Sequence, residues 1–396
     1  MTIGAAVLAS EEVPLSARSG LRLSATASFF IALIVFGLAG LAAFWLTTGS
    51  GHLSALGFSG FTVPDAISLE RSVHLAWRSN WSHIPNISTF LGTVLVYYPI
   101  ILFGKAYALV ANITLLALSA VLFNATLHRV AGSQYSGRIW LVALTMVSTN
   151  FYIISCLPYP NKEIPLIFLT SVNLLALVGG RWYLAGLSIF LSFWFRDGFA
   201  LILGMVAVVL ICRRFAFVSG GMIATLFLIM LLIAFPITEL AGVDRTLQRN
   251  VEIGAEIAGD KFSALGDIIA YGSRLVGNAV NLGLRPQVVD VQGGLYLLGI
   301  GYWQFGIILL AGLIWGVKNI FSSNVAKGCL ALTIMVSLLG ISYGTFVQPR
   351  YMMPMIFLLT LGLSESWIGR FVVVPVAVAM PILFMLMGGL PPLAGV

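Results

Sequence analysis

The chain has 396 residues, of which 59% are hydrophobic and only 9% are charged, and its mean hydropathy is +1.02. A soluble domain of this length needs a more polar surface than so few charges supply, so the composition excludes an ordinary soluble enzyme. Apolar stretches of about 18 or more residues recur along the chain, which indicates helices that cross hydrocarbon about 30 Å thick. We therefore predict an all-α, polytopic transmembrane helix bundle.

The apolar stretches predict about eleven spans, within a range of roughly 10 to 13. They lie near residues 24–47, 106–127, 139–157, 164–180, 182–195, 198–212, 217–238, 295–316, 328–346, 351–368 and 371–390. They divide the chain into a cytoplasmic N-terminal segment (1–23), a transmembrane module (24–238) with an outer loop (48–105), an outer loop region (239–294) and C-terminal transmembrane helices (295–396).

The distribution of charge predicts the orientation in the membrane. With the N-terminus in the cytoplasm, the predicted inner segments hold three acidic residues, Glu11, Glu12 and Glu365, and ten basic ones: Arg18, Arg22, Arg129, Arg138, Arg181, Arg213, Arg214, Lys318, Lys327 and Arg370. The whole excess of +7 then lies inside, as the positive-inside rule requires. The net charge is therefore no sign of a nucleic-acid partner, and we predict a bacterial inner-membrane protein whose active face is periplasmic.

The first outer loop contains VPDAISLERSVHLAWRSNW, which has the spacing of an amphipathic helix. Its apolar and polar faces are formed by Leu69, Val73 and Ala76 and by Glu70, His74 and Arg78, respectively. This pattern predicts a helix that lies on the membrane surface.

Residues 87–104 follow in the same loop and are long enough to span the membrane. A crossing there would move His128, Arg129 and Arg138 to the outer face. We therefore predict a juxtamembrane or re-entrant helix on the outer side, broken near Pro99, with two extra half-spans as the alternative.

Ionisable residues mark the outer ends of several predicted spans, which makes them candidates for a functional site. These are Asp65, Glu70, Lys162, Glu163, Arg196, Asp197 and Arg350. Arg196 and Asp197 stand between apolar runs of 14 and 15 residues, 182–195 and 198–212. Helices of about 21–23 Å do not lift their connection clear of the hydrocarbon core, so this pair should lie in a polar cavity below the outer surface.

Each candidate also has a purely structural interpretation. Asp65 suits the cap of its helix, and Lys162 with Glu163 suits a solvated turn between prolines. Arg196 and Asp197 suit a mutual ion pair, and Arg350 suits an anchor at the interface. His74 fits a surface helix better than a base or a ligand.

Several sequence motifs are absent. The chain has no GxxxxGK[ST], HExxH or GxSxG motif and no CxxC pair, so ATP-driven transport, a zinc protease and a hydrolase with a nucleophile elbow are unsupported.

Four segments resemble polytopic glycosyltransferases of the C class (GT-C), which use polyprenyl-phosphate-linked sugars. They are PDAISLERSVHLAW with YYPIILFGKAYALVANITLL, then LPYPNKEIPLIFLTSVNLLAL, GLSIFLSFWFRDGFALIL and QPRYMMPMIFLL. The resemblance covers about residues 60–370 and implies a GT-C-like bundle with juxtamembrane helices on the outer face. O-antigen and exopolysaccharide polymerases are similar as well.

The resemblance implies transfer of a sugar or oligosaccharide from a lipid-linked donor to a glycan or lipid acceptor, with membrane lipids around the protein. It implies Asp65 as the base and Lys162, Arg196 and Arg350 on the donor phosphate, with Glu163 as a further catalytic carboxylate. Glu70, His74, Asp197 and Tyr351 are secondary candidates. This chemistry suits the residue types, because a carboxylate accepts the acceptor's proton and an arginine fork holds phosphate oxygens.

The first loop holds Asp65 with Glu70 five residues later and no DxD-type acidic pair. The sequence therefore requires no cofactor and leaves the metal open. It also leaves open a polymerase, a lipid-linked glycan flippase or secondary transporter, and a non-catalytic assembly partner of a polysaccharide machine. Transporters often show repeated halves, and this sequence shows no internal repeat.

Overall fold

The computed structural model describes residues 23–48, 64–82, 87–131, 133–214, 296–322, 325–344, 351–366 and 369–379. The longer helices are α1 (Ala25–Thr48), α3 (Pro64–Arg78), α4 (Ile87–Tyr97), α6 (Lys105–Ala131), α7 (Ser133–Ser148), α9 (Glu163–Val178), α10 (Trp182–Phe193), α11 (Asp197–Arg214), α15 (Tyr296–Asn319) and α16 (Val325–Gly344). Every regular element in these segments is helical, which confirms the predicted all-α class for the described part of the chain. The predicted span 217–238, the outer region 239–294 and most of segment 1–23 lie outside the described residues.

Shorter helices complete the described chain. They are α5 (Ile100–Phe103), α8 (Phe151–Cys156), α17 (Ile356–Leu359), α18 (Leu361–Glu365), the 3₁₀ helix η2 (Met353–Met355) and the π-helix η3 (Gly369–Val373). Wherever the chain is described, helices occupy the positions of the predicted spans, although two predicted spans are broken. The span near 139–157 divides at Asn150, whose side chain accepts hydrogen bonds from the backbone of Tyr152 and Ile153 and so begins α8.

Two of the described helical segments, Ala25–Ala43 and Lys105–Val130, are long and apolar enough to cross a membrane. A third span is present if Met353–Glu365 and Gly369–Ala379, which meet at 112°, form one bent unit. The shorter apolar segments of 10–17 residues in the described chain are Gly137–Ser148, Glu163–Val178, Trp182–Phe193, Gly198–Leu210, Gln304–Asn319 and Lys327–Leu338. The number of eleven spans therefore stays a prediction.

Several helices expose apolar side chains along one face. On α1, Phe30, Ile34, Leu38 and Leu41 are 56–64% exposed and recur at helical spacing. Exposed apolar side chains also follow α10, where Tyr183 is among them. Contiguous apolar surface of this kind suits contact with hydrocarbon, because it is unfavourable in water.

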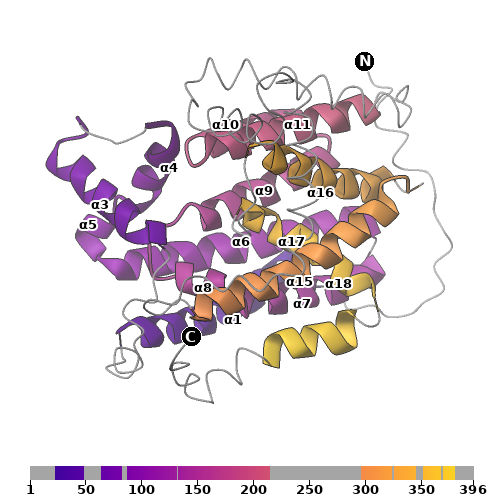
Figure 1. The fold of residues 1–396 in the computed structure, drawn as a ribbon, viewed down its shortest axis with the longest axis horizontal. Coiled ribbons are helices and arrows are strands. Elements are labelled where there is room, and N and C mark those ends of the chain that lie inside the picture. Colours follow the sequence, from indigo (N-terminus) through magenta and orange to yellow (C-terminus); the bar gives the residue numbers. More distant parts are fainter. Residues whose placement is uncertain are drawn as a thin grey trace, which may run out of the picture.

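Helix α6 lies in the middle of the described bundle and packs against α1, α7 and α9 (Figure 1). Helix α9 continues the packing to α10, and α11 joins α10 to α16. The approach of α1 to α6 is close at Gly40, where an added Cβ would lie 2.7 Å from Cδ1 of Ile113. The small residue Gly40 therefore allows α1 and α6 to approach closely, as small residues commonly do between transmembrane helices.

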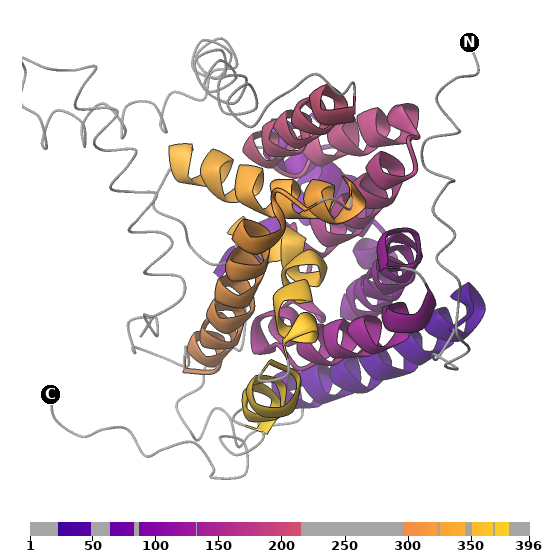
Figure 2. The same ribbon diagram turned by 90° about the vertical axis from the view of Figure 1, so that its right-hand side faces the viewer.

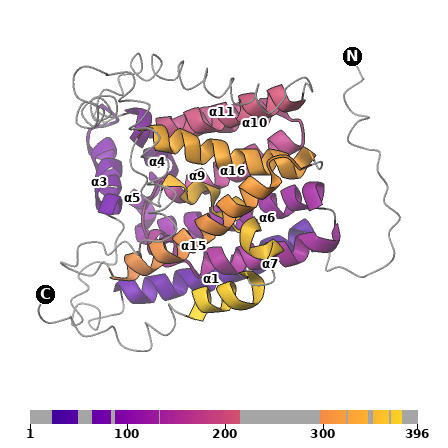
Figure 3. The same ribbon diagram turned by 45° about the vertical axis from the view of Figure 1, so that its right-hand side comes forward.

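The two ends of the bundle differ in what they carry. Helices α3, α4 and α5 gather at one end, to the left in Figures 1 and 3. At the opposite end, the guanidinium of Arg129 lies against Gly179, which follows the last turn of α9. Lys327 and Glu365 form an ion pair of 2.9 Å there, between the start of α16 and the end of α18. We name these the α3–α5 end and the basic end.

The break predicted near Pro99 is confirmed, because α4 ends at Tyr97 and α5 begins at Ile100. The predicted surroundings of the amphipathic helix α3 are wrong in one respect. Its apolar residues Leu69, Val73 and Ala76 are buried, and Val73 and Ala76 belong to one cluster with residues of α4, α5 and α6. This apolar face therefore meets protein and is not free to lie on a membrane surface.

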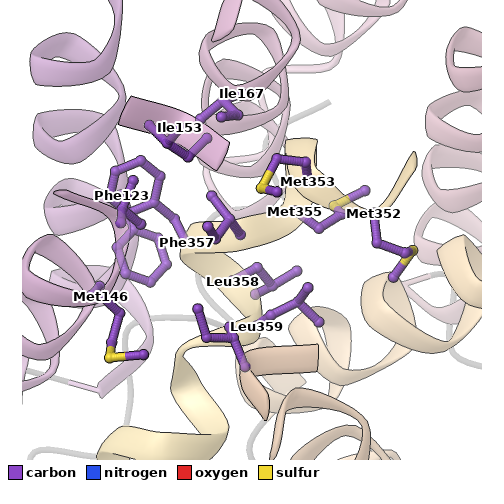
Figure 4. Packing of buried hydrophobic residues seen from close by; sticks show 14 of the residues in the cluster. Phe123, Met146, Ile153, Ile167, Met352, Met353, Met355, Phe357, Leu358 and Leu359 are labelled. Atoms are coloured by element: carbon purple, nitrogen blue, oxygen red, sulfur yellow. The ribbon is translucent and has the colours of Figure 1, made fainter. Parts of the chain in front are cut away.

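The predicted span near 351–368 is helical but irregular, because the described chain there is divided into η2, α17 and α18. This yellow segment lies between the orange helices and the purple ones in Figure 2. Phe357 contacts Phe123 of α6 with ring centroids 5.5 Å apart, and Figure 4 shows Ile153 and Ile167 nearby. Gly362 approaches α15 so closely that an added Cβ would lie 1.9 Å from the carbonyl oxygen of Ala311.

Candidate functional site

The turn between α8 and α9 places Glu163 at the first position of α9. The side-chain oxygen of Asn161 accepts a hydrogen bond from the backbone N–H of Ile164 (2.8 Å) and so caps the helix. One carboxylate oxygen of Glu163, Oε2, accepts from the backbone N–H of Lys162 at 3.1 Å. Glu163 is almost fully buried, and its negative charge is favoured at the positive end of the helix dipole.

The short connection between α10 and α11 places Arg196 opposite this carboxylate. The backbone N–H of Arg196 donates to the carbonyl of Ser192 at 2.9 Å, which holds the arginine against the last turn of α10. Its Nη2 lies 3.5 Å from Oε1 of Glu163, and its side chain is 17% exposed. Such a separation is at the long limit of a hydrogen bond, so the guanidinium of Arg196 is only weakly hydrogen-bonded to Glu163.

Tyr351 supplies one wall for the arginine. The guanidinium carbon of Arg196 lies 5.0 Å from the centroid of the Tyr351 ring, a cation–π distance. The other terminal nitrogen, Nη1, is buried and has no hydrogen-bond partner among the described residues. An unsatisfied buried donor costs about 1–3 kcal/mol, so this nitrogen favours any acceptor oxygen that reaches it.

A second polar group lies around Tyr159, in the turn before Glu163. The ammonium of Lys105 lies 4.8 Å from the centroid of the Tyr159 ring. Burial raises the pKa of the Tyr159 hydroxyl, and the negative charge of nearby Glu70 raises it further. The turn before Glu163 therefore lies near two further charged residues, Glu70 of α3 and Lys105 at the start of α6.

The structure brings together part of the predicted site. Arg196 contacts both Glu163 and Tyr351, and Lys162 is in the same turn as Tyr159. Arg196 thus pairs with Glu163, a partner that the sequence does not indicate.

The other candidates are less closely placed. Glu70 is near Tyr159, and His74 is one turn further along α3 and partly exposed. Asp65 and Asp197 belong to α3 and α11, but their side chains are outside the described part of the structure. Arg350 falls among the residues that the structure does not describe.

Sequence reasoning missed Asn112, which is fully buried in α6. Its amide donates to the carbonyls of Cys156 (3.2 Å), Leu157 (2.9 Å) and Tyr159 (3.0 Å), and it thereby fixes the turn before Glu163. Asn161 donates to two of the same carbonyls. An asparagine within the apolar run ALVANITLLAL was the available sign, since a polar side chain in such a run needs a partner.

The arrangement offers a cationic fork with one open donor beside a carboxylate, which suits the binding of an anion and the transfer of a proton. Among the described residues, no three His, Cys, Asp or Glu side chains gather as a metal site would require. No family model, curated protein or solved structure matches the chain.

Proposed function

We propose that the chain is an integral membrane glycosyltransferase of the GT-C class. It transfers a sugar or oligosaccharide from a polyprenyl-phosphate-linked donor to a glycan or lipid acceptor at the α3–α5 end. The observation that carries this proposal is Arg196, whose guanidinium is held by Glu163 and Tyr351 while its buried Nη1 has no hydrogen-bond partner in the described chain.

The proposed reaction needs a fixed positive charge more than it needs a cofactor. The acceptor hydroxyl attacks the anomeric carbon, and the bond from that carbon to the phosphate oxygen breaks. The electron pair leaves with the lipid phosphate, so negative charge grows on it in the transition state. Arg196 suits this position because its planar fork offers a donor to a phosphate oxygen while Glu163 and Tyr351 hold the other edge and one face.

The hydroxyl proton passes to a carboxylate in this scheme. Asp65 is the proposed base, and Glu70 lies in the same helix, near Tyr159 in the turn before Glu163. Glu163 and Lys162 would position the donor head group, because the ion pair already commits the Glu163 carboxylate to Arg196. The scheme routes no step through a metal.

The orientation follows from the two ends of the bundle. Arg129 and Lys327 are at the basic end, opposite α3–α5, which supports a cytoplasmic basic end and a periplasmic site. We accordingly propose the bacterial inner membrane as the location. Lipid-linked donors would reach the site from the outer leaflet.

Transport of a lipid-linked glycan is the second candidate, and one observation favours it. The buried segment of η2, α17 and α18 is a broken helix in the interior of the described bundle. Transporters commonly use discontinuous helices to form substrate sites. A polysaccharide polymerase uses the same donor chemistry as the transferase, and the length of the glycan product separates the two.

The deciding experiment uses Arg196→Gln, with Arg181→Gln as the control because Arg181 is an exposed arginine beyond the other end of α9. Membranes containing each variant receive a polyprenyl-phosphate-linked hexose labelled in the sugar. We expect Arg196→Gln to lose on the order of a hundredfold or more in sugar release, equivalent to about 2–4 kcal/mol of lost transition-state stabilisation. Arg181→Gln should retain the rate of the parent.

Two results would contradict the proposal. Undiminished release by Arg196→Gln would remove Arg196 from the reaction. Movement of the intact labelled lipid across the membrane, with no cleavage in any variant, would favour the transporter.

A further inference from the structure

Helix α4 contacts the chain immediately before Arg196. The backbone N–H of Gly92 donates to the carbonyl of Trp194 at 2.9 Å. A Cβ at Gly92 would lie 2.9 Å from that oxygen and equally close to the ring of Phe195. The helix therefore sits directly on the connection between α10 and α11, with no room for a side chain.

The same helix reaches the other half of the ion pair through a buried chain of hydrogen bonds. The hydroxyl of Tyr97 donates to Oδ1 of Asn112 at 2.5 Å. The amide of Asn112 donates in turn to the carbonyls of Cys156, Leu157 and Tyr159. These carbonyls belong to the chain that leads from the end of α8 to Glu163, and the five residues of this hydrogen-bonded series are all buried.

Gly92 and Tyr97 are five residues apart in one helix, a rise of about 7.5 Å. The middle of this short helix thus contacts the chain that leads into Arg196, and its last residue, Tyr97, reaches through Asn112 the chain that leads into Glu163. Hydrogen bonds in a dry surrounding are directional and costly to leave unmade, so both contacts resist displacement.

We propose that α4 is the positioning element of the Glu163–Arg196 pair, and that it acts through its own residues Gly92 and Tyr97 and through Asn112 of α6. The role of this positioning in sugar transfer rests on the function proposed above. Helix α4 also packs against α3, so displacement of α3 would change the separation of the two charges.

The test measures the coupling between the two charges without any substrate. Glu163→Gln, Arg196→Gln and the double variant form a double-mutant cycle on the unfolding of the purified protein in detergent. The cycle is measured in the parent, in Gly92→Ala and in Tyr97→Phe. In the parent, we expect the changes in the free energy of unfolding caused by Glu163→Gln and Arg196→Gln to be non-additive. In Gly92→Ala and in Tyr97→Phe, we expect the two changes to be additive.

The chain offers a matched control for each variant. Gly186→Ala places a methyl group on α10, where no atom lies within 4 Å of the new Cβ. Tyr107→Phe removes a tyrosine hydroxyl that donates to the carbonyl of Val96 in α4 but does not bond to Asn112. The coupling should survive in both controls.

Additive shifts in the parent would overturn the proposal, as would coupling that survives in Gly92→Ala and Tyr97→Phe or is lost equally in the controls. Tyr97→Phe keeps the ring and removes only the hydroxyl, so the test remains valid if Gly92→Ala fails to fold. The same variants enter the sugar-release assay separately. Absence of release in the parent would refute the transferase and leave the positioning result unaffected.

Discussion

Two buried regions of this protein hold their residues in place by different means. Around Phe357 and Gly362, apolar side chains and backbone fit together, and the approach to Ala311 leaves no room for a methyl group. Around Glu163, two asparagine amides hold the turn by directed hydrogen bonds, and Nη1 of Arg196 has no hydrogen-bond partner among the described residues. The first region is therefore held by close packing, whereas the second is held by hydrogen bonds and an ion pair.

The largest expected effect tests the close-packed region. Gly362→Ala would place a Cβ 1.9 Å from the carbonyl oxygen of Ala311, so α18 and α15 must separate. We expect a loss of about 3 kcal/mol or more in the free energy of unfolding, at the upper end for overpacking. Gly204→Ala is the control, since its new methyl meets open space and should stabilise α11 slightly. Equal unfolding midpoints of the two variants in detergent would show that α15 and α18 can separate without loss of stability.

A smaller effect is expected at the Glu163–Arg196 pair. Tyr351→Leu removes the ring under Arg196, which should cost about 0.5–2 kcal/mol in binding of a polyprenyl phosphate, or up to roughly thirtyfold in affinity. Tyr351→Phe keeps the ring and should stay near the parent. Titration of the purified variants with the lipid phosphate measures both. Equal weakening in Phe and Leu variants would assign the role to the hydroxyl group instead.

The smallest effect is expected at the basic end. Lys327 and Glu365 form an ion pair at 2.9 Å, but their side chains are 31% and 34% exposed. Solvent screens such a pair, so Glu365→Gln should change the free energy of unfolding by less than about 1 kcal/mol. Sugar release should be unaffected. A marked loss of release would place function at both ends of the bundle.

Local sequence pattern predicted much of the fold. The apolar runs located α1, α6 and the other described helices, and Pro99 located the break between α4 and α5. Patterns fail where a tertiary contact decides the outcome. The apolar face of α3 has the same spacing whether it meets lipid or α4, and only the fold shows that α4 covers it.

The candidate site, too, was only partly predictable from local sequence. Glu163 and Arg196 were recognisable because charge is rare in so apolar a chain. Their pairing joins two connections on different helices, and nothing in the local sequence of either indicates it. Asn112 and Tyr97 were missed for the same reason, since their roles depend on a turn that begins more than forty residues later in the chain.

The central place of α6 has a consequence for how the chain is made. During synthesis α1 is complete at Thr48, but the helix that covers its Gly40 face begins only at Lys105. Until α6 emerges from the ribosome, Ser28 of α1 lacks the amide of Asn124 that later bonds to it at 2.8 Å. Helix α1 is therefore translated before its partner, with α3, α4 and α5 in between, and its Gly40 face and the Ser28 hydroxyl stay without these contacts until α6 is made.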